Sequence, residues 1–118
     1  MIRFLGFNGR KPGMSKEEFD RLRWEQHAPL SLATTGMLRY VHYYIKGKRP
    51  SRSDVPSVDP GIDGFSEMWF EDMDAYFRWR ESPEGKILLA DGASYMGFGE
   101  HFIVEKRVVF DRWLSPKA

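Results

Sequence analysis

The segment that most constrains the fold is residues 38–46, Leu-Arg-Tyr-Val-His-Tyr-Tyr-Ile-Lys. Side chains alternate between the two faces of a β-strand, so Tyr40, His42 and Tyr44 share one face while Val41 and its neighbours occupy the other. A strand with one face in water alternates more cleanly between apolar and polar residues. Because both faces of this strand carry large side chains, the segment predicts a sheet that packs against protein on both sides.

The remaining predicted elements complete a β-α-β-β-α-β order. Strands are expected at residues 2–8, 38–46, 65–70 and 100–109, helices at 15–36 and, in two pieces, at 72–90, and loops at 47–64 and 91–99. This order is the ferredoxin-like split βαβ motif, an α+β fold. In that fold, helices cover one face of a four-stranded antiparallel sheet.

Local signals fix the predicted helix boundaries. Ser15 followed three residues later by Glu18 forms a capping box, so the first helix begins there. Asp72 is the expected cap of the second helix, and Ser82 before Pro83 restarts it. Pro29 has no N–H for the carbonyl four residues earlier, so a kink is expected in the first helix.

The other face of the sheet is predicted to be an association surface. It is apolar and aromatic although no helix covers it, and an exposed apolar patch of that size marks an interface. Two sheets packed face to face would form a homodimeric α/β barrel. The single domain spans residues 1–118, with a core of 1–109 and a tail of 110–118. The tail carries Phe110, Trp113 and Leu114 and is expected to cross the partner subunit or close one mouth of the barrel.

Composition and charge argue against several classes of protein and of functional site. Lys and Arg total 18 against 17 Asp and Glu, with the two signs interleaved, so a nucleic-acid-binding stripe is not expected. There is no cysteine, which removes disulfides, thiolate metal sites and a Cys nucleophile. No apolar run approaches the ~18 residues of a membrane span, and the first residues are too short for a secretory signal, so we expect a cytoplasmic protein. The basic run at 46–52 is either a solvated loop or a lip that attracts an anionic substrate.

Short motifs along nearly the whole chain resemble the EthD family. They lie at residues 1–19, 24–30, 38–41, 64–70 and 82–86. The resemblance implies a dimeric ferredoxin-like α/β barrel and, for members with assigned chemistry, cofactor-free decarboxylation, isomerisation or dehydration. The segments around Val55 and 63–70 are also similar to the methylmuconolactone methylisomerases. Those enzymes carry a Cys where this chain has Met68, whereas their pocket His and strand-two Tyr match His27 and Tyr40.

His27 is the leading catalytic candidate. Counted at about 100° per residue, it lies about 80° around the helix from Phe19, at the flank of the buried face. A His there can take and return protons near neutral pH, although spacing alone equally fits a structural His at a helix end. Tyr40 could hydrogen-bond a substrate oxygen and stabilise an enolate, or it could line the dimer interface.

Five further residues are candidates for substrate binding: His42, Asp63, Glu67, Trp69 and Tyr95. His42 shares the strand face of Tyr40, and Glu67 is either a second acid–base group or the partner of an arginine. Asp63 and Tyr95 lie in predicted loops that could close over a pocket. No metal site is expected, because His27, His42 and His101 lack metal-ligand spacing.

The leading hypothesis is a cofactor-free lyase or isomerase acting on a small aromatic, lactone or polyketide-like acid. His27 would move the proton while Tyr40 holds the developing oxyanion. Two alternatives stay open. One is a cofactor-free monooxygenase in which Trp69 and other aromatic residues shield a substrate radical or carbanion while oxygen reacts. The other is a non-catalytic module that binds a hydrophobic small molecule.

Overall fold

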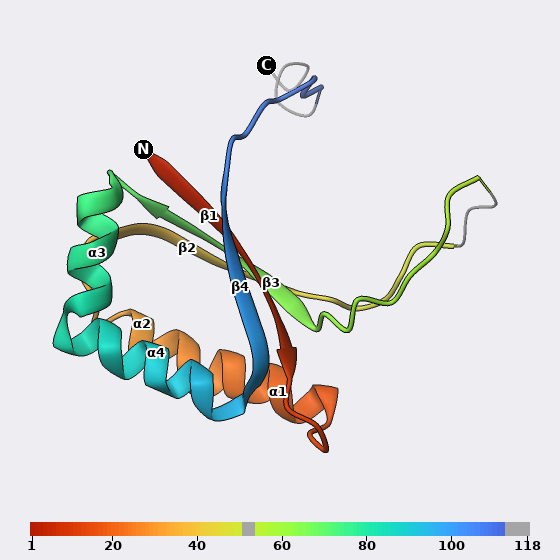
Figure 1. Ribbon diagram of the computed structural model, residues 1–118, viewed down its shortest axis with the longest axis horizontal. Helices are drawn as coiled ribbons and strands as arrows, with labels where there is room; N and C mark the ends of the chain where they lie inside the picture. Colours follow the sequence, from red (N-terminus) through yellow and green to blue (C-terminus); the bar gives the residue numbers. More distant parts are fainter. Residues whose placement is uncertain (51–53, 113–118) are drawn as a thin grey trace.

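A computed structural model describes residues 1–50 and 54–112 (Figure 1). The elements are β1 (Ile2–Arg10), α1 (Lys16–Leu22), the π-helical turn η1 (Arg23–His27), α2 (Ala28–Ser31), β2 (Met37–Tyr44), β3 (Gly64–Phe70), α3 (Met73–Glu81), α4 (Pro83–Tyr95) and β4 (Met96–Val104). The predicted β-α-β-β-α-β order is confirmed, with α3 and α4 as the two pieces of the second helical segment. No helix in the described ranges is long and apolar enough to cross a membrane.

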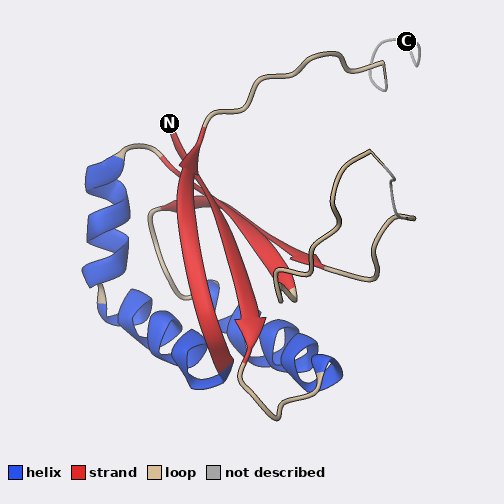
Figure 2. Cartoon of the chain, turned by 45° about the vertical axis from the view of Figure 1, so that its right-hand side comes forward, coloured by secondary structure: helices blue, strands red, loops and turns tan. Residues whose placement is uncertain are grey.

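The four strands form one antiparallel sheet in the order β2-β3-β1-β4. All helices lie on one face of this sheet, as Figures 1 and 2 show. The register pairs Tyr40 with Met68 and Met68 with Phe4, so these three side chains share one face. Met68 and Phe4 are both buried, which identifies this face as the one beneath the helices. The predicted ferredoxin-like α+β fold is therefore confirmed.

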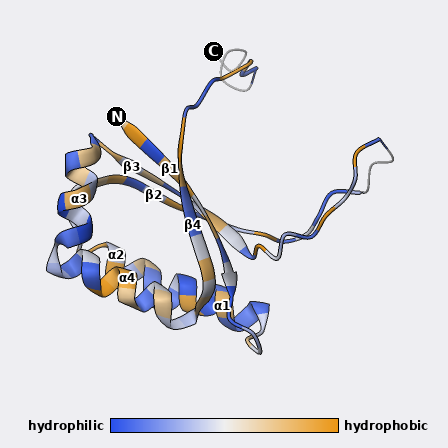
Figure 3. Cartoon of the chain, in the orientation of Figure 1, coloured by the Kyte–Doolittle hydropathy of each residue, from blue (hydrophilic) through white to orange (hydrophobic). Residues whose placement is uncertain are grey.

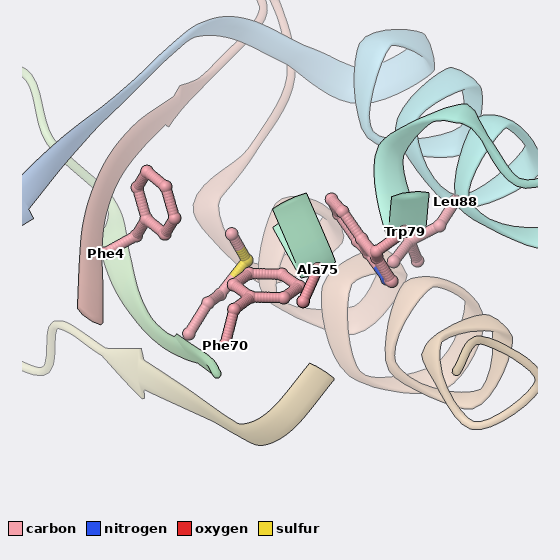
Figure 4. Close-up of a cluster of buried hydrophobic side chains, with 6 residues drawn as sticks. Phe4, Phe70, Ala75, Trp79 and Leu88 are labelled. Atoms are coloured by element: carbon pink, nitrogen blue, oxygen red, sulfur yellow. The ribbon is translucent and has the colours of Figure 1, made fainter. Parts of the chain in front are cut away.

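The core lies between the sheet and the helices. Figure 4 shows Phe4 and Phe70 from the sheet facing Ala75, Trp79 and Leu88 from α3 and α4. Phe70 is fully buried, and its ring contacts Phe4 edge-on with centroids 5.9 Å apart. Apolar colour is strong along the part of α4 that faces α2 (Figure 3). Burial of such side chains, at about 1.5–3 kcal/mol each, holds the helices on the sheet.

The predicted caps are confirmed. The Ser15 side chain accepts a hydrogen bond from the Glu18 N–H, and Asp72 accepts from Ala75 N–H. Ser82 caps α4 by accepting from Gly85 N–H, with Pro83 at the first helical position. Each of these contacts spans three residues, which explains why the local sequence predicts them.

One predicted loop is wrong. Residues 91–99 were expected to be irregular because Asp91-Gly92 is a common turn pair, but α4 continues to Tyr95 and β4 begins at Met96. Gly92 is buried, and a Cβ there would lie 3.3 Å from His27 Cε1. The glycine therefore allows α4 to pack closely against the first helical segment and does not end the helix.

The face away from the helices is open in the single chain. Tyr43 is 40% exposed and Phe102 is 52% exposed, so the described residues do not supply the second covering layer predicted for this sheet. Val109 and Phe110 follow β4 and are also exposed. Trp113 and Leu114 of the predicted tail lie outside the described residues.

Candidate functional site

A small cavity lies between the sheet and the helices. Its volume is about 130 Å³. Its lining is mostly apolar, with a few polar side chains: Asn8, His27, Tyr40, Ser66 and His101. An apolar pocket with a few convergent polar groups is the usual form of a small-molecule site.

The π-helical turn η1 brings His27 to this cavity. In a regular α-helix His27 would point about 80° away from Phe19, but one extra residue in a wider turn takes back about 100°. Phe19, Arg23 and His27 are accordingly all buried and share the inner face of the helix. The wider turn directly precedes Pro29, which cannot donate to the Glu25 carbonyl in an α-helical register. The interruption expected at Pro29 thus takes the form of this turn.

A buried carboxylate holds His27. The His27 Nδ1 atom lies 2.9 Å from Asp91 Oδ2, and the two side chains are only 7% and 8% exposed. Gln26 donates a second hydrogen bond to the other oxygen of Asp91. Because an ionised carboxylate only accepts hydrogen bonds, Nδ1 carries the proton and Nε2 has a free lone pair. Burial lowers the pKa of His27, although Asp91 opposes the shift, so the ring is neutral at pH 7.

Tyr40 lies on the sheet side of the cavity beside Ser66. Burial raises the pKa of Tyr40 to about 12, and a hydrogen bond with Ser66 and the charge of Arg23 oppose that rise. The phenol therefore stays protonated near neutral pH and can donate a hydrogen bond to a substrate oxygen.

His42 lies next to the cavity residues but outside the cavity lining. Its ring stacks on His27 with centroids 6.1 Å apart and meets Tyr40 edge-on at 4.6 Å. Its Nδ1 lies 3.0 Å from the Tyr44 hydroxyl oxygen. Burial, Arg23 and His27 together lower the pKa of His42 to about 3. His42 lines a groove between α2 and β2. Its ring contacts support the rings of His27 and Tyr40.

The sheet separates two of the predicted substrate-binding residues from His27. Glu67 and Trp69 alternate with the buried residues of β3, so they lie on the open face. Glu67 accepts hydrogen bonds from Tyr43 and from the Trp69 indole, and not from the arginine that we expected as its partner. The tryptophan that lines the cavity is therefore Trp79 of α3, and not Trp69 as we expected.

The two predicted loop residues are both anchored. Asp63 accepts a hydrogen bond from Arg10 N–H at 2.8 Å, at the end of β1, and does not line the cavity. Tyr95 is not in a loop: it ends α4, is 1% exposed, and packs edge-on against His27 with centroids 5.9 Å apart. Its hydroxyl has no hydrogen-bond partner among the described residues. Tyr95 therefore supports the ring of His27 from beneath.

Sequence reasoning missed Asp91, Asn8 and Ser66. Asp91 was assigned to a loop, so its place opposite His27 on a helix had no signal. Asn8 is 5% exposed and lines the cavity, and its Oδ1 has no partner among the described residues. A polar residue inside the apolar run of β1 is the one feature that could have identified it. Within the described ranges, no group of three His, Cys, Asp or Glu side chains could hold a metal ion.

Residues 11–99 match the EthD domain, whereas no curated protein matches the chain. An ethyl tert-butyl ether d (EthD) family protein from Bacillus halodurans is similar in structure, with a TM-score of 0.70, 22% identity, and 91% of this chain and 100% of that chain covered. The hydroxynitrile lyase from Passiflora edulis has a TM-score of 0.63 at 16% identity, covering 91% and 95%. SnoaB, a cofactor-independent oxygenase from Streptomyces nogalater, has a TM-score of 0.57 at 14% identity, covering 91% and 93%.

Proposed function

The chain belongs to the EthD family, and on that premise we propose that it is a cofactor-free lyase or isomerase in which His27 transfers a proton. The observation that carries the proposal is the buried His27–Asp91 pair at the wall of a small, mostly apolar cavity. A neutral imidazole with one nitrogen fixed by a carboxylate is a general base with its second nitrogen available.

The proposed reaction begins with loss of a proton from a carbon next to a carbonyl. His27 Nε2 takes the proton, and the C–H electron pair moves into the C=C bond of an enolate. Asp91 stabilises the imidazolium that forms, because its carboxylate already accepts the Nδ1–H. Tyr40 donates its hydroxyl proton in a hydrogen bond to the enolate oxygen.

The fate of the enolate decides the reaction class. Return of the proton to a different carbon completes an isomerisation. Loss of a β-hydroxyl group, with the proton from His27 making water, completes a dehydration. Decarboxylation runs through the same enolate, formed when carbon dioxide leaves, but it requires His27 to begin protonated. The neutral ring at pH 7 therefore favours isomerisation or dehydration. The resemblance of the 63–70 segment to the methylmuconolactone methylisomerases stays a prediction, and on it we propose a lactone as one candidate substrate.

The size of the cavity supports a small substrate. About 130 Å³ is close to the ~150 Å³ of an apolar protein cavity that holds one benzene molecule. A compound with a single six-membered ring or lactone ring therefore fits better than a fused polycyclic polyketide.

A cofactor-free monooxygenase is the second candidate. The observation that favours it is the aromatic side of the cavity, where Tyr76 and Trp79 would shield a substrate carbanion from water. A cofactor-independent oxygenase has a similar fold, which is a second reason to test this chain for oxygenase activity. The same His27 would form the carbanion, so oxygen uptake separates the two reactions.

We also propose that the chain acts as a homodimer. The exposed apolar side chains Phe98 and Phe102 of β4, with Val109 and Phe110 beyond it, support this. Sheets packed through their open faces would cover Tyr43 and Phe102, and burial of each large side chain contributes about 1.5–3 kcal/mol.

Proton exchange with deuterium oxide tests the reaction without knowledge of the natural substrate. Single-ring enolisable lactones and β-keto esters are incubated with the protein in D2O, and deuterium incorporation next to the carbonyl is followed by NMR. We expect the wild type to accelerate exchange and His27→Gln to abolish it. Asp59→Asn is the control, because the Asp59 side chain is 77% exposed and lies outside the cavity lining, so the variant should retain exchange.

The same samples are monitored with an oxygen electrode. Oxygen uptake that requires His27 would favour the monooxygenase. Binding of these compounds without exchange or oxygen uptake would refute both enzymatic proposals and leave the binding module. Exchange that survives His27→Gln would show that another group is the base.

A further inference from the structure

Arg23 is a buried cation and the first residue of the π-helical turn η1. Its side chain is among the largest fully buried ones, at 1% exposed. Its guanidinium donates to the backbone carbonyls of Tyr43 at 2.9 Å and Phe65 at 2.8 Å, and to Ser66 Oγ at 3.3 Å. Gly64 makes room for it, because a Cβ at that position would collide with the guanidinium.

Burial lowers the pKa of Arg23, and the Asp20 carboxylate, which forms no ion pair with it, does little to oppose that shift. Among the described residues, Arg23 forms no ion pair, and its polar contacts are two carbonyls and a hydroxyl. The Tyr44 ring lies 4.8 Å from the guanidinium carbon, which adds a weak cation–π contact. The carbonyls satisfy N–H donors and tie the helix to β2 and β3, but they do not neutralise a full positive charge. Burial of an unpaired cation is unfavourable by several kcal/mol, so a structural tie alone would be served better by a neutral donor.

The charge of Arg23 reaches the cavity through Ser66. Ser66 accepts from Arg23 and lines the cavity together with Tyr40, and the charge of Arg23 and the Ser66 hydroxyl both act to lower the pKa of Tyr40 against its burial. Such a chain of donors polarises the Tyr40 hydroxyl and makes it a stronger donor toward a bound oxygen. The Asp91 carboxylate is held by His27 and Gln26. Within the described ranges, no carboxylate belongs to the cavity lining.

We propose that Arg23, acting through Ser66 and Tyr40, makes the cavity selective for a single-ring compound whose ring oxygen carries or develops a negative charge, such as a phenolate or an enolate. Arg23 is then a positioning residue, since it touches no substrate. This inference rests on the proposed function only in taking the cavity as the substrate site. It adds the class of substrate and the residue that sets the preference.

The test is the binding of 4-nitrophenol, whose phenol and phenolate forms absorb at different wavelengths and interconvert near neutral pH. Titration of the bound probe gives the ratio of the affinities for its two forms. We expect the wild type to bind phenolate at least about tenfold more tightly than phenol, the size of one hydrogen bond to a charged group. Ser66→Ala interrupts the chain while the two carbonyl contacts of Arg23 remain, and we expect it to lower this ratio at least threefold.

Arg23→Gln removes the charge, and we expect the ratio to approach one. Ser31→Ala is the matched control, because the Ser31 hydroxyl donates to Ala28 O within α2 and the ratio should not change. If Arg23→Gln does not fold, the affinity ratio measured in Ser66→Ala decides whether the inference holds. An equal affinity of the wild type for both forms, a preference that survives Ser66→Ala, or no binding at all would overturn the inference. Because the assay reads binding, a phenolate preference without deuterium exchange would refute the proposed function and not this selectivity.

Discussion

Asp91→Asn is predicted to weaken proton binding at His27. The substitution keeps the size of the side chain and removes its negative charge. The His27 Nδ1 to Asp91 Oδ2 distance of 2.9 Å and exposures of 7% and 8% place the contact away from solvent, so screening is weak. Asp91 is the group that raises the His27 pKa against burial, through its hydrogen bond and its charge. Without it the pKa of His27 falls further below its ordinary value.

The size of the effect follows from the hydrogen bond. A hydrogen bond to a charged group contributes about 1.5–3 kcal/mol, and the amide oxygen of Asn would still accept a neutral one. The imidazolium therefore loses up to about 1.5–3 kcal/mol of stabilisation, and its affinity for a proton falls about 10- to 100-fold. The exchange rate should fall about tenfold or more, because the amide also permits the wrong orientation of the ring.

The measurement is an NMR titration of the His27 ring protons in the wild type and in Asp91→Asn, with deuterium exchange measured over the same pH range. Asp59→Asn is the matched control, because the Asp59 side chain is 77% exposed and its cationic contact is Lys48. A His27 pKa that is unchanged or higher in Asp91→Asn would refute the reasoning. So would an exchange rate equal to that of the wild type.

Three further predictions concern acid stability, the core and the tail. Below pH 6.5 the unfolded chain binds a proton at His42, whereas the folded chain does not bind it until about pH 3, so the free energy of unfolding falls with falling pH by at most about 5 kcal/mol. Urea unfolding at pH 7 and pH 4 should show a smaller loss of stability in His42→Phe than in the wild type, and an equal loss would contradict this. Phe19→Ala empties a site that is 0% exposed and should destabilise the protein by about 3–5 kcal/mol in the same assay at pH 7, whereas a change below 1 kcal/mol would show that the site collapses. Truncation after Val109 should weaken the dimer in sedimentation, and an unchanged dimer with unchanged thermal stability would show that the tail neither crosses the partner nor closes the barrel.

The candidate site was predictable only in part. His27 and Tyr40 were identified from the sequence, and the structure brings both to one cavity. Glu67 and Trp69 lie on the other side of the sheet, because alternation along β3 assigns them to the face opposite Met68. The alternation was visible in the sequence, but which face lies beneath the helices was not.

The amino-acid sequence by itself determined the order of the elements and the positions of the helix caps. These depend on contacts within three or four residues, such as Ser15 with Glu18, and on a side-chain period that short segments display. The tertiary structure alone decided that His27 points inward and that Asp91 meets it from 64 residues away. A π-helical turn rotates the first, and the close packing allowed by Gly92 positions the second. The position of Asp91 is a product of helix-on-helix packing, which overrides the local preference of Asp91-Gly92 for a turn.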